Sequence, residues 1–330
     1  MEMPLFGIGT YTVTGEECSN IIFNGLKLGY RLIDTAELYD NHKDIASAIA
    51  TAQQHNIATR EDVWISSKIH NRNQRRLEIG QAVQKIISEL NTNYIDLVML
   101  HSAQKTYVSA YKELLTVKNF FNIRNIGVSN FRQDELEAIT KHTGITPYIN
   151  QVEISPFNQR LQLREYMKEH TILTQAYGSL VCGKMFDSEY LQHDSNTPDQ
   201  LLLGWGKYYN IRPIPTSHTL TELQMNYNTL QYKQLDIQTI QQLAKEIKIP
   251  RYGKSRIVIN ENGIELHGEF YSWDNICVTG YITKYKQTSL LVVGLTDGEI
   301  EEVQGPSEWR MGIDELGHLI ELYKIKHRKC

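Results

Sequence analysis

Short β-rich apolar runs alternate with amphipathic segments over about the first 230 residues, and this alternation predicts an α/β fold. Eight such runs occur, which is the strand count of a (β/α)8 TIM barrel. A doubly wound sheet would alternate in the same way, but no GxGxxG motif follows the first run. The rhythm changes near the C-terminus. We therefore predict a barrel at residues 1–250 and a small C-terminal β-plus-helix domain at 255–330.

The predicted strands are runs of mostly apolar residues, and several of them end on a polar residue. The eight runs are Leu5–Gly9, Arg31–Asp34, Val63–Lys68, Leu97–His101, Asn125–Val128, Ile149–Glu153, Ile172–Ala176 and Arg212–Pro215. The helix-like stretches between them include Glu16–Leu28, Arg76–Leu90, Asp134–His142 and Asp199–Tyr209. In the first of these, Ile21, Ile22 and Leu26 place apolar side chains on one face, which is typical of a helix packed against a sheet.

From about Lys254 onward, β-like runs follow one another without an intervening helix, through Arg256–Val303. Asn262-Gly263 and Asp297-Gly298 are hairpin signals because type I′ turns require positive φ at both central residues. The closing stretch Gly312–Lys326 has apolar residues at helical spacing. A few strands followed by one helix predict a separate small domain. Its basic end could be a binding tail, although a solvated helix terminus is the favoured interpretation.

Composition excludes several functional classes. The formal net charge of −4 gives no electrostatic reason to expect binding to nucleic acid or to an anionic membrane. No apolar run approaches the roughly 20 residues needed to span a bilayer, and the first ten residues lack the features of a secretory signal. The cysteines form no CxxC pair, so neither a zinc site nor a disulfide framework is expected. These features predict a cytoplasmic protein without a metal centre.

Polar residues end three consecutive predicted strands. Asp34, Lys68 and His101 lie 34 and 33 residues apart, about one strand-helix unit each, and Tyr39 follows Asp34 in the next loop. In a parallel barrel these strand ends meet at one rim, where the active sites of such barrels lie. A single histidine or lysine at a strand end is more often structural. Burying four polar groups together costs several kcal/mol unless they satisfy one another, so the set predicts a functional site.

Several blocks, in order from about residue 4 to residue 250, resemble the signature blocks of aldo-keto reductases. They are Gly7-Ile8-Gly9-Thr10-Tyr11, Asp34-Thr35-Ala36-Glu37-Leu38-Tyr39, Ser67-Lys68, Ile95-Asp96-Leu97-Val98-Met99-Leu100-His101, Gly127-Val128-Ser129-Asn130-Phe131, Asn150-Gln151-Val152-Glu153, Ala176-Tyr177 and Ile214-Pro215-Thr216-Ser217. The resemblance implies reduction of an aldehyde or ketone by hydride transfer from a nicotinamide cofactor.

The resemblance also implies a role for each polar residue at the rim. Tyr39 would be the general acid, although a free tyrosine has a pKa near 10 and donates protons poorly at neutral pH. A cationic Lys68 nearby would lower that pKa, and Asp34 would hold Lys68 in place. His101 would orient or polarise the substrate carbonyl. The chemistry requires no metal.

Further residues are implied as cofactor contacts. Those matching Ser129, Asn130 and Gln151 bind the nicotinamide carboxamide in the family, and an aromatic residue matching Tyr177 stacks on the ring. Taken alone, Ser129-Asn130 would be better explained as a helix N-cap. The other expected contacts are Gly9, Thr10, Gly178 (through its backbone), Leu180, Thr216, Ser217, Glu222 and Asn226.

Two departures from the family pattern bear on the choice between NADPH and NADH. Many members carry a lysine and an arginine that clamp the 2′-phosphate of NADPH, where this sequence has Thr216 and Glu222. A carboxylate repels a phosphate but can accept a hydrogen bond from a free ribose hydroxyl. NADPH is the usual cofactor of the family, and His218 or Asn226 could still support it. Thr216 and Glu222 make NADH the alternative.

Other departures leave the substrate open. Tyr11, His42 and His70 replace residues common in the family, and we expect them to line a polar substrate mouth. The segment around Tyr271-Ser272-Trp273 is faintly similar to pleckstrin-homology-like modules, so residues 255–330 could bind a protein partner or mediate self-contact. Two alternatives to the reductase remain: a cofactor-binding regulatory barrel of low activity, and a Schiff-base aldolase that uses Lys68.

Overall fold

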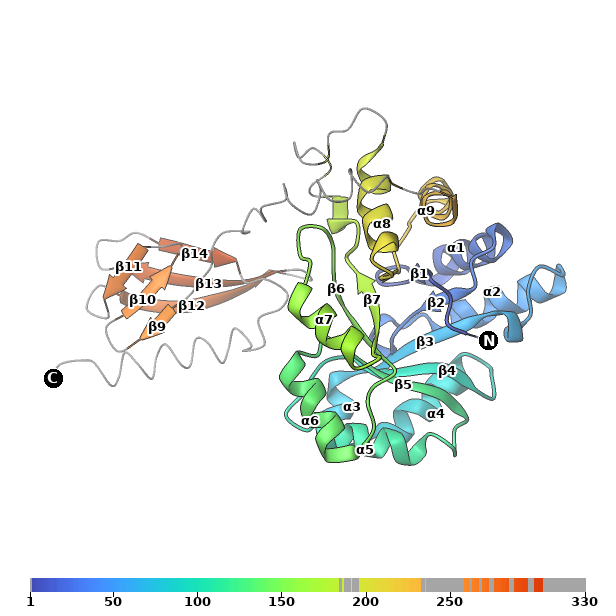
Figure 1. Ribbon diagram of the computed structural model, residues 1–330, viewed down its shortest axis with the longest axis horizontal. Helices are drawn as coiled ribbons and strands as arrows, with labels where there is room; N and C mark the ends of the chain where they lie inside the picture. Colours follow the sequence, from blue (N-terminus) through green and yellow to red (C-terminus); the bar gives the residue numbers. More distant parts are fainter. Residues whose placement is uncertain are drawn as a thin grey trace. The chain divides into compact units, whose positions relative to one another are not determined.

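The computed structural model describes residues 2–183, 186, 191, 196–232 and 235, together with six strands of the C-terminal part. The chain divides into two compact units, Met1–Ile247 and Lys248–Cys330. Figure 1 shows the first unit with its strands surrounded by helices.

The first unit contains an eight-stranded parallel sheet whose strands follow one another in sequence order, as a (β/α)8 fold requires. The strands are β1 Ile8–Gly9, β2 Leu32–Asp34, β3 Trp64–Ile69, β4 Ile95–Leu100, β5 Ile123–Ser129, β6 Ile149–Glu153, β7 Leu173–Tyr177 and β8 Arg212–Pro213. Every predicted run overlaps one of them. The predicted alternation of strands and helices is therefore confirmed.

Backbone hydrogen bonds join the first and last strands and so close the barrel. The amide of Gly7 donates to the carbonyl of Pro213, and that of Gly9 donates to Pro215, both at 3.1 Å. A Cβ atom at Gly9 would lie 2.5 Å from the carbonyl oxygen of Ile214. A residue without a side chain is therefore needed at this seam.

Helices cover the outside of the barrel (Figure 1). They are α1 Gly15–Leu28, α2 His42–Gln54, α3 Asn71–Arg76, α4 Ile79–Glu89, α5 Tyr107–Val117, α6 Gln133–Thr143, α7 Leu161–Glu169, α8 Pro198–Tyr208 and α9 Leu220–Tyr232. The single helix predicted at Arg76–Leu90 begins later, because Leu77 adopts a left-handed conformation that ends α3 before α4 starts.

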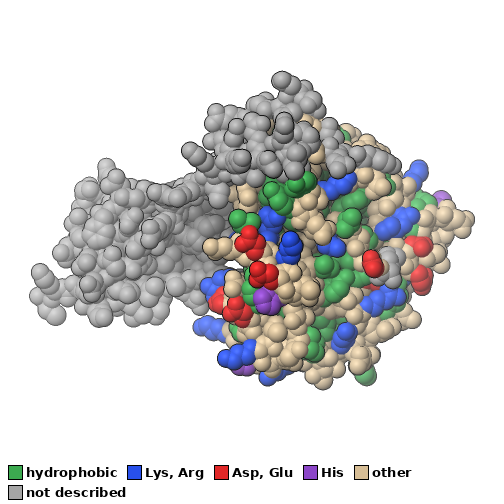
Figure 2. Space-filling view, in the orientation of Figure 1, with side chains coloured by type: hydrophobic (Ala, Val, Ile, Leu, Met, Phe, Trp, Pro, Cys, Tyr) green, Lys and Arg blue, Asp and Glu red, His purple; other side chains and the backbone are tan. Residues whose placement is uncertain are grey.

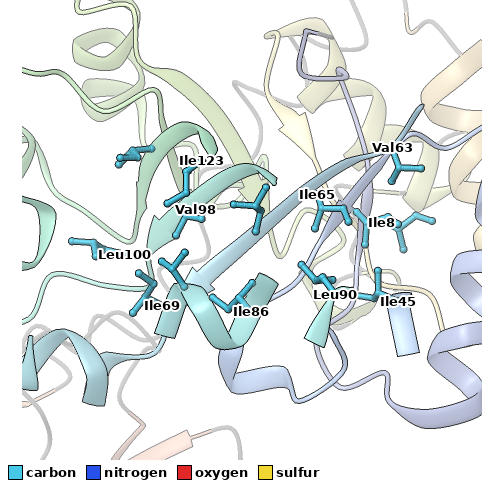
Figure 3. Close-up of a cluster of buried hydrophobic side chains, with 14 of the residues drawn as sticks. Ile8, Ile45, Val63, Ile65, Ile69, Ile86, Leu90, Val98, Leu100 and Ile123 are labelled. Carbon is cyan, nitrogen blue, oxygen red and sulfur yellow. The ribbon is translucent and has the colours of Figure 1, made fainter. Parts of the chain in front are cut away.

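Apolar side chains on the two faces of the strands form separate layers. Outward-facing residues such as Ile65 and Val98 pack against helix residues such as Ile45 and Ile86, and all four are buried (Figure 3). Inward-facing residues fill the lower part of the barrel with a second apolar cluster, formed by Met3, Leu32, Trp64, Leu97, Met99, Ile149 and Ile214. The polar residues at the strand ends thus lie above an apolar floor, which keeps water away from them.

The second unit is described through two three-stranded antiparallel sheets. Their strands are β9 Val258–Asn260, β10 Gly263–Leu266, β11 Glu269–Ser272, β12 Ile276–Lys284, β13 Thr288–Leu295 and β14 Ile300–Gln304. Strands β9 and β10 are antiparallel neighbours, but Asn262 of the predicted Asn262-Gly263 turn and both residues of the predicted Asp297-Gly298 turn lie outside the described residues. The predicted helix at Gly312–Lys326 lies outside the described residues.

Within the described part of the chain, none of the helices is both long enough and apolar enough to cross a membrane.

Candidate active site

An ion pair joins the ends of the neighbouring strands β2 and β3. Lys68 Nζ lies 2.5 Å from Asp34 Oδ2 and donates a second hydrogen bond to the carbonyl of Thr35 at 3.0 Å. Both side chains are buried, and Lys68 is only 1% exposed. Because β2 and β3 run parallel with Asp34 opposite Ser66, Lys68 extends one step further along the same inner face. The predicted Asp34–Lys68 pair is present.

The Tyr39 hydroxyl completes a chain of contacts with this pair. Tyr39 ends the short 3-10 helix η1 (Glu37–Tyr39), and Asp40 in a left-handed conformation terminates that helix. Its Oη lies 3.4 Å from Lys68 Nζ, and the ammonium lies 4.9 Å from the centre of the phenol ring. The Lys68 ammonium therefore contacts both a carboxylate and a phenol.

Glu37, which the sequence reasoning did not single out, anchors η1 to the segment after β3. Its Oε2 accepts a hydrogen bond from the His70 amide at 2.9 Å, and its Oε1 accepts one from Asn73 Nδ2 at 2.6 Å. These bonds hold the loop carrying Tyr39 against the strand end carrying Lys68. The only signal in the sequence was the position of Glu37 inside the block that ends on Tyr39.

His101 directly follows β4 and faces the phenol. The ring centres of His101 and Tyr39 are 6.0 Å apart and nearly perpendicular. Asn130 Nδ2 donates to the His101 carbonyl at 3.2 Å, which ties the end of β4 to the end of β5. All four predicted catalytic residues, Asp34, Tyr39, Lys68 and His101, thus come together at one rim.

Burial and charge set the protonation states of these groups. Burial raises the pKa of Tyr39 and outweighs the opposing effect of Lys68. The expected lowering of the Tyr39 pKa by Lys68 is thus present but smaller than the effect of burial. Burial alone would lower the pKa of Lys68, but Asp34 and Tyr39 raise it, so the amine stays protonated. Burial, with help from Lys68 and His70, lowers the pKa of His101 to about 3, so its imidazole is neutral.

A second group of polar side chains continues the rim across β5, β6 and β7. The Ser129 hydroxyl donates to the backbone carbonyl of Gln151 at 2.9 Å, and Asn130 Nδ2 donates to the Ser129 hydroxyl at 3.2 Å. The Tyr177 hydroxyl donates to Asn130 Oδ1 at 2.8 Å. Asn130 has φ of 60°, a left-handed conformation that asparagine tolerates. The four residues predicted to bind nicotinamide are adjacent.

Gln151 links the two groups. Its Nε2 donates to Asp34 Oδ1 at 2.7 Å and to Gln175 Oε1 at 2.6 Å, and all three side chains are buried. This connection runs through the barrel interior, between strands far apart in the sequence. The sequence reasoning missed Gln175, because an inward-facing glutamine one layer below the rim gives no distinctive pattern.

Gly9, Thr10 and Gly178 lie at or near the same end of the barrel. The Thr10 hydroxyl donates to the Asp34 carbonyl at 2.9 Å, while Gly9 belongs to the closing seam. Gly178 follows β7 with φ of 63°, and a Cβ there would lie 3.1 Å from Glu153 Cγ. Leu180 packs against an apolar cluster beside β7.

The residues expected near the adenosine end of the cofactor surround the start of α9. Asn226 Nδ2 donates to the Ser217 hydroxyl at 3.0 Å, and both side chains are buried. Thr216 pairs with Gly9 in an isolated parallel bridge. Glu222 Oε2 accepts hydrogen bonds from the amides of His218 at 2.8 Å and Thr219 at 3.2 Å. Glu222 therefore already has a structural role as a cap of α9.

One expectation about the substrate mouth is wrong. His42 is 2% exposed and contacts Ser67 and Glu89 behind the barrel wall, because α2 packs against β3 at this point. Tyr11 is 45% exposed, and its ring centre lies 5.1 Å from that of Tyr39. His70 caps α3, accepting a hydrogen bond from the Arg72 amide. Of the three, Tyr11 and His70 remain close to the site.

The donor set at the rim fits a nicotinamide amide. A hydroxyl, two carboxamides and a phenol at one rim can both donate to and accept from an amide. Among the described residues, no group of three or more His, Cys, Asp or Glu side chains is placed to hold a metal ion.

Comparison with known proteins agrees with this chemistry. The model of the aldo/keto reductase family matches residues 5–246. Methylglyoxal reductase DkgA of Yersinia pestis is 32% identical over 240 residues, covering 70% of this chain and 84% of the relative. Glyoxal reductase of Bacillus subtilis is 31% identical over 257 residues, covering 76% of this chain and 92% of the relative.

Solved structures share the fold. An aldo/keto reductase from Brucella melitensis superposes with a TM-score of 0.68 at 27% identity, over 74% of this chain and 95% of that chain. A Bombyx mori aldo-keto reductase in complex with NADP has a TM-score of 0.68 at 23% identity, over 77% of this chain and 93% of that chain. The chain therefore belongs to the aldo/keto reductase family, and it is an NAD(P)H-dependent oxidoreductase that reduces carbonyl groups.

Proposed function

We propose that this reductase acts on small aldehydes and ketones, with Tyr39 as the proton donor. The observation that supports this role is the buried contact chain from Asp34 through Lys68 to the Tyr39 hydroxyl, with distances of 2.5 and 3.4 Å. When bound, a nicotinamide cofactor supplies a hydride to the carbonyl carbon. The carbonyl oxygen then needs a proton, and Tyr39 is the hydroxyl beside the site that can give it.

The surrounding charges suit this proton transfer. Because burial raises the pKa of Tyr39, the phenol is protonated at neutral pH and ready to donate. The Lys68 ammonium stabilises the tyrosinate that forms, and Asp34 fixes Lys68 in position. A neutral His101 can donate one hydrogen bond to the carbonyl oxygen and so orient it toward Tyr39.

Replacing Tyr39 tests the proposal directly. We expect Tyr39→Phe to lower kcat for methylglyoxal by a factor of about 10³, since a lost general acid costs about 10²–10⁴-fold. Tyr208→Phe is the matched control, because Tyr208 is an exposed phenol on α8 that has no contact with Lys68 among the described residues. Equal rates for Tyr39→Phe and wild type would exclude the assigned role.

The substrate class rests on the relatives and on the polar mouth. Two relatives are named for methylglyoxal and glyoxal, small and strongly electrophilic carbonyl compounds. Tyr11 and His70 give this chain a polar approach to Tyr39, which suits hydrated, oxygen-rich substrates. A comparison of kcat/KM for methylglyoxal and hexanal checks the assignment, and a preference for hexanal would contradict it.

Ser129, Asn130 and Gln151 would hold the nicotinamide carboxamide, and the face of Tyr177 would support the ring. In support, the Tyr177 hydroxyl bonds to Asn130, which orients the phenol ring. Gly178, whose φ of 63° favours glycine, would bring its backbone to the pyrophosphate. Gly9, Thr10 and Leu180 are the remaining proposed contacts at this end.

Glu222 is the residue that we expect to set the preference between NADPH and NADH. Thr216, Ser217 and Asn226 would contact the adenosine part, where a clamp of two cations is missing. Because Glu222 Oε2 is held by two backbone amides, its charge is fixed beside this region. We expect KM for NADPH to fall in Glu222→Gln, which can retain one cap bond, while KM for NADH changes little. An unchanged ratio of the two KM values would leave NADPH as the cofactor and Glu222 as a helix cap.

An aldolase mechanism is disfavoured because a Schiff base requires a neutral amine. Asp34 and Tyr39 raise the pKa of Lys68, so its amine is protonated at neutral pH. Trapping of a substrate–lysine adduct by borohydride would support the aldolase mechanism instead.

The C-terminal residues 255–330 are proposed as a separate domain that contacts a protein partner or a second copy. Their two antiparallel sheets and the division of the chain at Ile247 support a separate unit. The match to the reductase family ends at residue 246, and the similarity to pleckstrin-homology-like modules stays a prediction. A regulatory role predicts that deleting 255–330 changes activity, and an unchanged kcat/KM would oppose it. We also propose a cytoplasmic location.

A further inference from the structure

The short helix α3, which follows Lys68 on β3, is pinned by buried amide side chains. Gln74 Nε2 donates to the Ile69 carbonyl at 2.8 Å, and Asn73 Nδ2 donates to Glu37 Oε1 at 2.6 Å. Gln74 is 0% exposed and Asn73 is 7% exposed. These bonds are directional, so they fix the helix in one orientation with respect to β3 and η1.

The exposed positions of this pinned helix include three arginines, Arg72, Arg75 and Arg76. None of them forms an ion pair with a carboxylate in the described part of the chain. Arg75 Nη1 donates to Gln104 Oε1 at 2.9 Å, and Gln104 in turn donates to the Ser102 hydroxyl. Three arginines thus lie within five residues of one helix, at positions i, i+3 and i+4, and no carboxylate in the described part of the chain pairs with them.

Helix α3, which carries the three arginines, contacts the loops of the candidate active site. The backbone amide of Arg72 donates to His70 Nδ1 at 3.0 Å, and the Ser102 hydroxyl donates to Asn71 Oδ1 at 3.0 Å. Through Gln104 and Ser102, Arg75 is joined to the loop that begins at His101. Helix α3, which carries the arginines, therefore contacts both η1, which ends on Tyr39, and the loop that begins at His101, on the face where barrels bind substrates.

The excess of positive charge on α3 contrasts with the charge of the rest of the chain. The whole chain carries 34 Lys and Arg against 38 Asp and Glu, so its net charge is negative. On the face of the barrel unit drawn in Figure 2, basic and acidic side chains are interspersed. An unneutralised group of guanidinium ions beside the site attracts anions selectively.

We propose that the substrate of this reductase carries a carboxylate in addition to its carbonyl group, and that Arg72, Arg75 and Arg76 recognise it. The inference rests on the proposed function, because it names the substrate class of the same site. Guanidinium groups bind carboxylates through paired hydrogen bonds, and the carboxylate would orient the far end of the substrate while the carbonyl meets Tyr39.

The test uses two aldehydes of the same shape that differ in charge: 4-formylbenzoate and its methyl ester. We expect wild type at low ionic strength to show a kcat/KM about tenfold higher for the acid than for the ester. In R72Q/R75Q/R76Q this ratio should fall to about one. It should also fall for wild type as salt is raised, since exposed charges are screened.

A matched variant removes three lysines from the helices α5, α6 and α7. Lys112, Lys141 and Lys168 are exposed and make no ion pair among the described residues. K112Q/K141Q/K168Q changes the net charge by the same amount, and we expect it to keep the wild-type ratio. If this variant loses the ratio equally, net charge and not the arginine group would be responsible, which overturns the proposal.

Turnover of the ester by wild type checks the proposed function separately from this inference. Binding of the product acid, 4-(hydroxymethyl)benzoate, measured by calorimetry with NADP⁺ present, gives a second readout that needs no turnover. Weaker binding by the arginine variant than by the lysine variant supports the proposal. Equal binding by both variants, or an acid-to-ester ratio near one in wild type, overturns it.

Discussion

Two polar clusters lie back to back on consecutive residues of β3. Lys68 faces the barrel interior and contacts Asp34 and Tyr39. Ser67 faces outward, where its hydroxyl lies 2.9 Å from His42 Nε2, and His42 Nδ1 lies 3.2 Å from Glu89 Oε2. The outer set has the residue types and the order of contacts of a hydrolase triad.

The two clusters differ in whether a substrate can reach them. Ser67 is 0% exposed and His42 is 2% exposed, so no substrate can reach the outer hydroxyl. The inner cluster meets the rim through Tyr39, which is only half-buried. Residue type and mutual distance are therefore insufficient to identify a catalytic site, because the reacting atom must also meet its substrate. We interpret the outer cluster as structural.

The largest expected effect comes from removing the inner cation. Lys68→Met leaves the Asp34 carboxylate buried without its partner, which costs about 3–5 kcal/mol in the free energy of unfolding and also abolishes reduction. Asp34→Asn/Lys68→Met should regain most of that stability without regaining activity. Chemical denaturation and kcat measure the two effects. Equal stability of the single and double variants would contradict a buried ion pair.

The second effect is a dependence of stability on pH that arises from His101. The pKa of His101 is lowered from 6.5 to about 3 in the folded protein, so between these values the unfolded chain binds more protons. The free energy of unfolding therefore falls as the pH drops from 6.5 toward 3, by up to about 1.4 kcal/mol per pH unit, and His101 costs no stability above pH 6.5. His101→Asn should flatten the profile of unfolding free energy in this range. An unaltered slope would show that His101 titrates normally.

A smaller effect is expected from His42, which holds the outer cluster together. His42→Leu leaves the Ser67 hydroxyl without a partner and leaves the partly buried Glu89 with only its 3.9 Å contact to Lys85, which costs about 2 kcal/mol of stability. The kcat of the folded variant should equal that of wild type, because the outer cluster faces away from Tyr39. A loss of kcat larger than tenfold at full folding would connect the clusters functionally.

Ser67→Ala should have the smallest effect. It removes one hydrogen bond and leaves His42 Nε2 unpaired, at a cost of about 1 kcal/mol. If the outer cluster were a hydrolase triad, this change would abolish hydrolysis of an activated ester such as p-nitrophenyl acetate. We expect no difference between Ser67→Ala and wild type in that assay.

Strand ends are the part of this fold that could be predicted from the sequence. Runs that stop on Asp34, Lys68 and His101 at matched spacing place these residues at one rim, because parallel strands of a barrel share a direction. That argument needs only the strand period and the topology, both of which are written in the order of residues along the chain. Ser129 and Gln151, in contrast, were expected only because of the resemblance to aldo-keto reductases.

Contacts across the barrel and between loops could not be predicted in this way. The bond from Gln151 to Asp34 joins residues 117 positions apart, and no local pattern encodes it. Glu37 stood out only as part of a signature block, and Glu222 only as a negative charge near the expected cofactor phosphate. In the structure, both carboxylates accept hydrogen bonds from backbone amides. His42 was placed at the mouth because it follows Tyr39 closely, but the turn of α2 directs it outward.

The seam between Gly7 and Pro213 has a consequence for how the molecule forms. These partners are roughly 200 residues apart, so the cylinder can be completed only after the last strand is available. Until then the first strand presents unpaired amides along an open edge, which can recruit the strands of other molecules. The final step of assembly is thus also the one most exposed to aggregation, and bringing the two ends together early would protect it.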